Sequence, residues 1–115
     1  MTVRVIPTPK GVPSFTMRVT LEQVEYRLDF AWNERDARWF FQLYTSGGDL
    51  ITSRKVIPDG RLLDGLVHAD RPPGDLVAID AAQLRTPIGL SDWGDRVVLA
   101  YLEASDVAEL AAAVG

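Results

Sequence analysis

The chain has 115 residues, of which 47% are hydrophobic, and it carries a formal net charge of −4 with no cysteine. This length and apolar content suit one domain with one core, and the lack of cysteine excludes a disulfide framework and a thiolate metal site. No run of about 18 apolar residues occurs, which excludes a membrane-spanning helix.

The charge is uneven along the chain. Residues 1–57 hold eight Lys/Arg and six Asp/Glu, a balance of +2, whereas residues 58–115 hold four and ten, a balance of −6. Because a surface that neutralises phosphates needs clustered Lys and Arg, the acidic total argues against nucleic acid as a partner. The asymmetry instead fits contacts with protein neighbours of differing charge.

The N-terminal half predicts a β-meander. A short strand at 3–6 and an irregular link with three prolines at 7–13 lead into two strands, at 14–21 and 25–32, in which apolar and polar residues alternate. A period of two places each apolar set on one face of a sheet, so this pattern specifies a core. In the loop that follows, 33–37, Asn33 and Asp36 suit side-chain bonds to the turn backbone and left-handed conformations.

The next strand, at 38–45, is apolar on both faces over Trp39, Phe40 and Phe41. Such a strand is typically central in its sheet and covered on both sides. Glycines at 47 and 48 predict a hairpin turn before a strand at 50–57.

The C-terminal half has weaker periodicity. Leu62, Leu63 and Leu66 fit either a short strand or one helical turn, and the choice stays open. Strands are expected at 76–79 and, deep in a sheet, at 97–103, with an irregular segment at 81–95 between them. Residues 104–115 carry a capping Ser105 or Asp106 before an alanine-rich run, which predicts a short helical or frayed tail.

About seven short strands at regular spacing predict an all-β fold, a small antiparallel β-barrel or sandwich with a short C-terminal helix. We expect a single domain over 1–115, made of an N-terminal strand and Pro-rich link at 1–13, a β-domain at 14–103 and the tail at 104–115.

Catalytic or ligand-binding motifs are not recognisable. His68, the only histidine, could be drawn with Asp64 and Asp70 as a metal or acid/base cluster, but the spacing fits no ligand motif, and a surface histidine is the better interpretation. We therefore expect no catalytic residues, no metal and no cofactor, and a protein that is not an enzyme.

The aromatic residues suggest a binding surface instead. Trp32 and Trp39 are expected in the core, whereas the faces of Phe40, Tyr44 and Trp93 cannot be filled internally and suit a protein interface. An alternative is a small β-barrel that binds a small ligand or single-stranded nucleic acid, with bases stacked on aromatic rings above a basic groove. Tyr26, Trp39, Phe40 and Tyr44 would then supply the rings, and Arg18, Arg27, Arg35 and Arg38 the groove.

Several segments, in this order, resemble the baseplate plug-domain family of short phage tail proteins, known from a contractile-tailed cyanophage. The similarity spans about residues 14–103, and its clearest part is Trp32-Asn33-Glu34-Arg35 followed by Arg38-Trp39-Phe40. Further similar segments are 21–26, 46–50, 62–63, 73–76 and 92–101.

The resemblance implies an all-β structural subunit of a phage or prophage-derived tail baseplate, which fills or braces the central hub. It implies other baseplate proteins as partners, a homo-oligomer in the assembly, no nucleic acid or membrane, and a place in the virion after synthesis in the bacterial host cytoplasm. Trp32, Asn33, Arg35 and Trp39 match the family motif, and we expect them to define the fold.

Overall fold

The computed structural model describes residues 3–83 and 86–105, and its elements are seven β-strands. They are β1 (Val3–Ile6), β2 (Ser14–Leu21), β3 (Val24–Asn33), β4 (Arg38–Thr45), β5 (Leu50–Lys55), β6 (Asp75–Asp80) and β7 (Val97–Leu102). They form two antiparallel sheets, with strand orders β1-β7-β6 and β2-β3-β4-β5. The all-β class is confirmed, and the described strands form no closed barrel.

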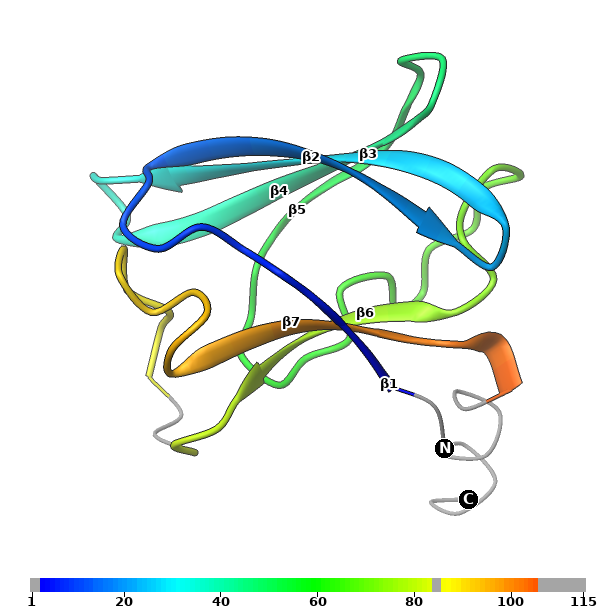
Figure 1. Cartoon of the computed structure of the whole chain (residues 1–115). Coiled ribbons are helices and arrows are strands. Elements are labelled where there is room, and N and C mark those ends of the chain that lie inside the picture. The colour runs from blue at the N-terminus through cyan, green and yellow to red at the C-terminus, as the bar shows by residue number, and fades with distance from the viewer. Residues whose placement is uncertain (1–2, 84–85, 106–115) are drawn as a thin grey trace.

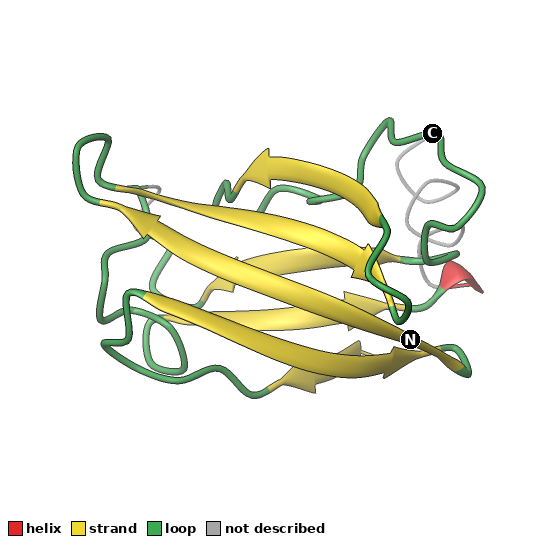
Figure 2. Ribbon diagram, turned by 90° about the horizontal axis from the view of Figure 1, so that it is seen from above, coloured by secondary structure: helices red, strands yellow, loops and turns green. Residues whose placement is uncertain are grey.

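The two sheets lie one above the other, with the four-stranded sheet above the three-stranded one in Figure 1. Seen from above, the long strands of the upper sheet run nearly alongside one another (Figure 2). Buried side chains from both sheets belong to one hydrophobic cluster, so the core lies between the sheets.

The predicted meander is confirmed, and its first turn is tight. Leu21 pairs with Val24, and the two residues between them, Glu22 and Gln23, have φ angles of 49° and 74°. Two successive positive φ angles are what a type I′ hairpin turn requires, and that turn matches the twist of the flanking strands.

The second turn uses the expected asparagine. The backbone N–H of Asp36 donates to Asn33 Oδ1 at 3.2 Å, as predicted for a side-chain bond to the turn. The left-handed conformation is adopted by Ala37, with φ 51°, and not by Asn33 or Asp36. This β-carbon in the left-handed region carries a steric cost that a glycine would avoid.

Aromatic rings fill the centre of the core. Trp39 is buried, and its ring lies 5.7 Å from Phe15, 5.6 Å from Trp32 and 6.0 Å from Trp93 between centroids. Its Nε1–H donates to the carbonyl of Gly89 at 3.1 Å, which satisfies the one polar group on the ring. Trp39 is therefore a core residue, as predicted, and Trp32 is only half-buried.

The strand expected at 50–57 ends earlier, at Lys55. After one more bond, from Val56 N–H to the carbonyl of Trp39, the chain crosses to the lower sheet. There Asp59 N–H donates to the carbonyl of Ala78 in β6 at 2.7 Å. This crossing segment continues into Leu62 and Leu63, which are buried in a turn and form neither a strand nor a helix.

The strands near the C-terminus agree with the prediction, since β6 and β7 cover 76–79 and nearly all of 97–103, and β7 is central in its sheet. The structure describes only Ala104 and Ser105 of the expected tail, so a helix over 106–115 lies outside the described residues. Within the described ranges, no helix is long and apolar enough to cross a membrane.

A tyrosine at the end of β7 joins three segments. Tyr101 donates its hydroxyl proton to Glu22 Oε2 at 2.5 Å and accepts from the N–H of Gly74 at 2.8 Å. A β-carbon at position 74 would lie 1.9 Å from the carbonyl oxygen of Leu102, so only glycine fits there. The contact ties the β2–β3 turn to the loop before β6.

Trp39→Ala is expected to lower the free energy of unfolding by about 3 to 5 kcal/mol, because it empties the centre of the aromatic core. Chemical denaturation measures this loss, with Trp32→Ala, at a half-buried ring, as a control that should cost clearly less. Equal losses in the two variants would contradict the placement of Trp39.

Tyr101→Phe is expected to cost about 1 to 3 kcal/mol, since it leaves Gly74 N–H and Glu22 without their partner. Burial raises the pKa of Tyr101 above 10.0, and the bond to Glu22 raises it further. Because the folded state holds this proton more tightly, the contribution of Tyr101 is complete below pH 10 and is lost as the pH rises beyond it. Urea titrations at increasing alkaline pH should show the wild type converging on Tyr101→Phe. Tyr26→Phe is the control for the lost hydrogen bonds, since no hydrogen bond of its hydroxyl is found among the described residues. Burial also raises the pKa of Tyr26, so this control is compared with Tyr101→Phe at neutral pH.

Candidate protein interface

The outer face of β4 carries the aromatic side chains that the core does not absorb. Trp39, Phe41 and Leu43 are buried, whereas Phe40 and Tyr44 on the opposite face are half-buried. Because β4 lies between β3 and β5, as predicted for a central strand, this face is flanked by side chains from both neighbours.

Tyr44 lies beneath an arginine from the neighbouring strand. Arg27 is directly opposite Tyr44 in the β3–β4 pairing, and its Cζ is 4.1 Å from the ring centroid. Arg27 also donates two hydrogen bonds to Asp29, at 3.2 and 3.1 Å, which fix the guanidinium over the ring. The hydroxyl of Tyr44 donates to Gln42 Oε1 at 2.9 Å. The ring is thus held rigidly while part of it remains accessible.

Phe40 has a similar cation beside it. Lys55 is opposite Phe40 in the β4–β5 pairing, and its Nζ lies 5.9 Å from the ring centroid. Leu50, opposite Tyr44, is 51% exposed and adds apolar surface on the same face. We call Arg27, Phe40, Tyr44, Leu50 and Lys55 the outer-face patch.

The patch continues into a shallow hollow at one end of β5. The hollow has a volume of about 380 Å³ and is lined by Arg38, Lys55, Val56, Ile57, Pro58 and Pro87. Ile57 is 59% exposed there. A surface that combines rigid aromatic rings, arginine and exposed aliphatic side chains is typical of the centre of protein interfaces.

The expectation that Trp93 has an exposed face was wrong. Its side chain is buried, 5.5 Å from Phe30 and 6.0 Å from Trp39 between centroids. The loop before β7 folds inward because Arg96 donates to Asp92 at 3.1 Å and to the carbonyls of Thr86 and Pro87. No periodicity in residues 81–95 signalled the burial of Trp93, since its ring packs against Phe30 and Trp39, which are distant in sequence.

His68 lies on the surface, and its Nδ1 accepts the backbone N–H of Asp70 at 3.1 Å. Asp64 pairs with Arg61, whose hydrogen bond lowers the pKa of the Asp64 carboxyl. Within residues 3–83 and 86–105, no group of three His, Asp or Glu side chains is arranged to hold a metal ion. The structure therefore does not bring His68, Asp64 and Asp70 together as a site.

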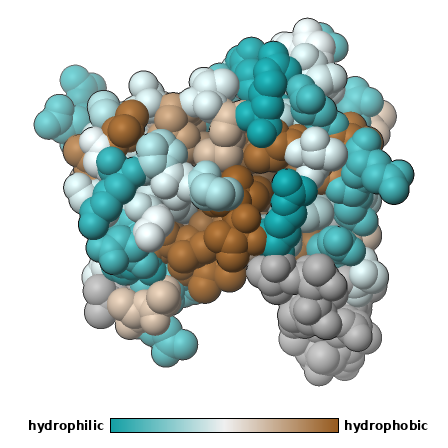
Figure 3. All heavy atoms as spheres, in the orientation of Figure 1, coloured by the Kyte–Doolittle hydropathy of each residue, from teal (hydrophilic) through white to brown (hydrophobic). Residues whose placement is uncertain are grey.

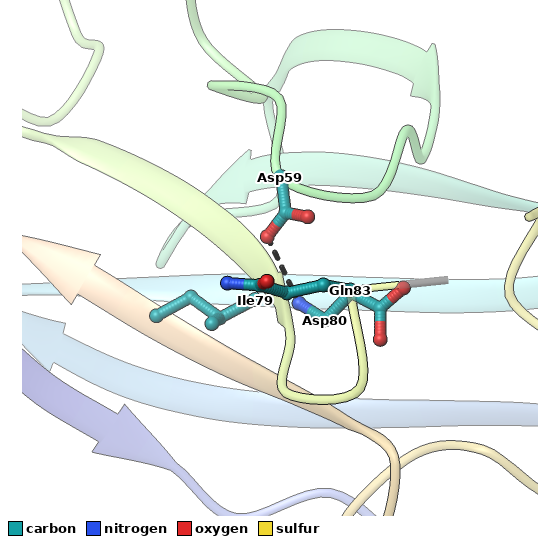
Figure 4. A pocket seen from close by; sticks show the side chains of 4 residues that line it. All are labelled: Asp59, Ile79, Asp80 and Gln83. Carbon is teal, nitrogen blue, oxygen red and sulfur yellow. Dashed lines mark hydrogen bonds between the residues drawn. The ribbon is translucent and has the colours of Figure 1, made fainter. Parts of the chain in front are cut away.

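A pocket of about 340 Å³ lies beside the end of β6, lined by Asp59, Ile79, Asp80 and Gln83 (Figure 4). Asp59 Oδ1 accepts the backbone N–H of Asp80 at 3.0 Å. The Asp80 carboxylate is bound to Arg96 at 2.9 Å, and that hydrogen bond raises the pKa of Arg96. Both carboxylates thus stabilise the loops around the pocket by accepting these hydrogen bonds.

The hypothesis of a stacking platform is wrong for two of its rings, because Tyr26 and Trp39 point into the core. On the outer face, Arg27 is already paired with Asp29, which neutralises part of the supposed groove. Lys55 and Leu50 were missed as neighbours of the aromatic rings. The signal that finds them is strand register. The hairpin turn places Leu50 opposite Tyr44, but the register shifts between Leu43 and Tyr44, so the length of the turn does not by itself place Lys55 opposite Phe40.

The chain is similar to one known family over almost its whole length. The model of the family described as "Cyanophage baseplate Pam3 plug gp18" matches residues 3–104, from the first strand to just beyond the last. The comparison with curated proteins gives no match.

Phe40→Ala should cost about 1 kcal/mol of stability or less, because that ring is only half-buried. The neighbouring Phe41→Ala is the matched comparison and should cost about 3 to 5 kcal/mol, because Phe41 is fully buried. Thermal and chemical denaturation measure both variants. A large loss for Phe40→Ala would mean that the outer face belongs to the core and is not available to a partner.

Proposed function

The chain belongs to the family of the cyanophage baseplate Pam3 plug gp18, and on that premise we propose that it is a non-enzymatic structural subunit of a phage or prophage-derived tail baseplate. The observation that carries this proposal is the extent of the family match, since residues 3–104 include all seven described strands. In this role the domain fills or braces the central hub of the baseplate by protein–protein contacts. Its place is in the virion, after synthesis in the cytoplasm of the bacterial host.

The outer-face patch supports contacts with other baseplate proteins. Its rings are held under Arg27 and Lys55 before any partner binds, so little side-chain freedom would be lost on association. We propose Phe40 and Tyr44 as anchors of this contact, and we exclude Trp93 because it is buried. The partners are proteins, including further copies of the chain, and neither nucleic acid nor a membrane is part of the proposal.

The architecture supports a rigid filler. Two facing sheets share one core, which favours a single sandwich-like domain over a barrel with a ligand cavity. A domain of this kind can brace neighbours by its shape without any moving part.

The proposed role predicts that the protein is present in assembled particles and that the outer-face patch is needed to hold it there. Phe40→Glu combined with Tyr44→Glu should leave the fold intact and strongly reduce the amount of the protein in purified particles. Val67→Glu is the matched control, because Val67 is 95% exposed and lies outside the patch. Mass spectrometry of the particles and electron microscopy of their baseplates measure the result. Complete, functional tails formed without the protein would contradict the structural role, and normal incorporation of the double variant would contradict only the patch.

A further inference from the structure

β2 is one of the two edge strands of the four-stranded sheet, and its free edge is long and regular. It pairs with β3 over eight consecutive residues without a register shift, and it contains no proline. Strand edges of this kind are usually blunted by proline, bulges or very short length, because their unpaired backbone groups can bind another strand. The edge of β2 lacks these features and is therefore able to pair with another strand.

In an antiparallel strand, alternate residues direct their backbone N–H and C=O groups to opposite sides, so the residues of β2 that face the free edge can be identified. Trp32 N–H donates to the carbonyl of Pro13, so the odd-numbered residues of β2 direct their backbone groups toward β3. The even-numbered residues, Ser14, Thr16, Arg18 and Thr20, direct theirs to the free edge. Among the described residues, only the carbonyl of Thr20 has a partner there, the guanidinium of Arg4.

A groove with a mixed polar and apolar lining runs along the same edge, between β1 and β2. It has a volume of about 340 Å³ and is lined by residues 4–7 and 17–20. Phe15 and Met17 on the inner side of β2 are only half-buried, and Val5 of β1 is 59% exposed. Figure 3, in the orientation of Figure 1, shows hydrophobic atoms gathered in the middle of this side of the molecule. A partner at this edge would thus gain hydrogen bonds and cover apolar surface together.

We propose that the free edge of β2 binds β2 of a second copy, antiparallel, so that two four-stranded sheets join across a twofold axis at Met17. Thr16 then lies opposite Arg18 of the second copy, and Ser14 lies opposite Thr20. These four residues are the ones whose backbone groups face the edge. A shift of two residues would place Arg18 opposite itself or leave Thr20 opposite the irregular link, so this register is favoured.

The inner side chains make the same edge self-complementary. In this register Phe15 lies opposite Val19 of the second copy and Met17 lies opposite Met17, so each copy covers the groove of the other. Two nearby cationic side chains form salt bridges within the chain, since Arg18 pairs with Glu25 and Lys10 pairs with Asp95, both at 3.0 Å. A second copy therefore suits the edge better than a strongly acidic foreign strand, and the proposal rests on the self-association included in the proposed function.

The first test is the mass of the full chain in solution, measured by light scattering and sedimentation over a concentration series. We expect a dimer, and Thr16→Pro should make it monomeric, because proline removes an edge N–H that β3 does not use. Thr16→Ala keeps that N–H and should remain dimeric. A wild type that is monomeric at every concentration, or a dimer that a folded Thr16→Pro variant retains, would overturn the proposal.

The register has its own test, which stands even where the proline variant fails to fold. Thr16→Glu places a carboxylate opposite Arg18 of the second copy twice per dimer and should tighten the dimer about 2- to 30-fold. Thr16→Arg should weaken it by a similar factor. Within one chain Thr16 is opposite Asp29, so the glutamate should destabilise the folded monomer and the arginine should stabilise it. These effects are opposite to those expected on the dimer. If Thr16→Arg formed a tighter dimer than Thr16→Glu, the proposed register would be overturned.

These measurements use the protein alone, and they separate the dimer from the baseplate role. A monomer in solution that still enters particles overturns the dimer and leaves the structural role in place. A protein that is dimeric in solution but absent from particles overturns the structural role and leaves the dimer in place. Pairing of the edge with a foreign strand would appear as a monomer whose amides at 14, 16 and 18 become protected from hydrogen exchange only when other tail proteins are added, and it would also overturn the proposal.

Discussion

The edge-to-face contact between Trp39 and Trp93 is the interaction on which the two sheets depend. Trp39 belongs to β4 of the upper sheet, and Trp93 precedes β7 and bridges to Val97 of the lower sheet. Their centroids are 6.0 Å apart at an angle of 71°, a favoured geometry for aromatic pairs. The indole of Trp39 also donates to Gly89, so the same residue positions the loop that carries Trp93. The packing of the two indole rings and the position of the loop that carries Trp93 therefore depend on each other.

Buried charge holds that loop in place. Arg96 binds the buried carboxylate of Asp80 at 2.9 Å and Asp92 at 3.1 Å, and Asp92 Oδ2 accepts the N–H of Gly89. Desolvation offsets much of the attraction in such a pair, so its main effect is on geometry and less on net stability. Asp75, also buried, accepts the N–H groups of Leu63 and Leu76. The irregular half of the chain is thus ordered by carboxylates that accept backbone hydrogen bonds.

The sequence predicts the regular half of the fold well and the irregular half poorly, for a physical reason. β2 and β4 were predicted to the residue because each residue's face follows from a local period of two. The burial of Trp93 depends on Arg96, Asp80 and Gly89, whose contacts span up to fifty residues and leave no periodic trace. The candidate interface was half predictable: Phe40 and Tyr44 follow from alternation. Their cation partners follow only from strand register.

The two surfaces proposed for contacts are geometrically independent. The outer-face patch centres on β4, two strands away from the edge of β2, and faces outward from the sheet. The edge of β2 offers hydrogen bonds within the plane of the same sheet, so a strand added there would not cover Phe40 or Tyr44. A dimer joined at β2 would instead present two outer-face patches on the same side of one continuous sheet. Two weak contacts held together in this way bind more tightly than either alone, because the second forms without a new loss of translational freedom. The edge can therefore increase the affinity of the patch for a repeated surface.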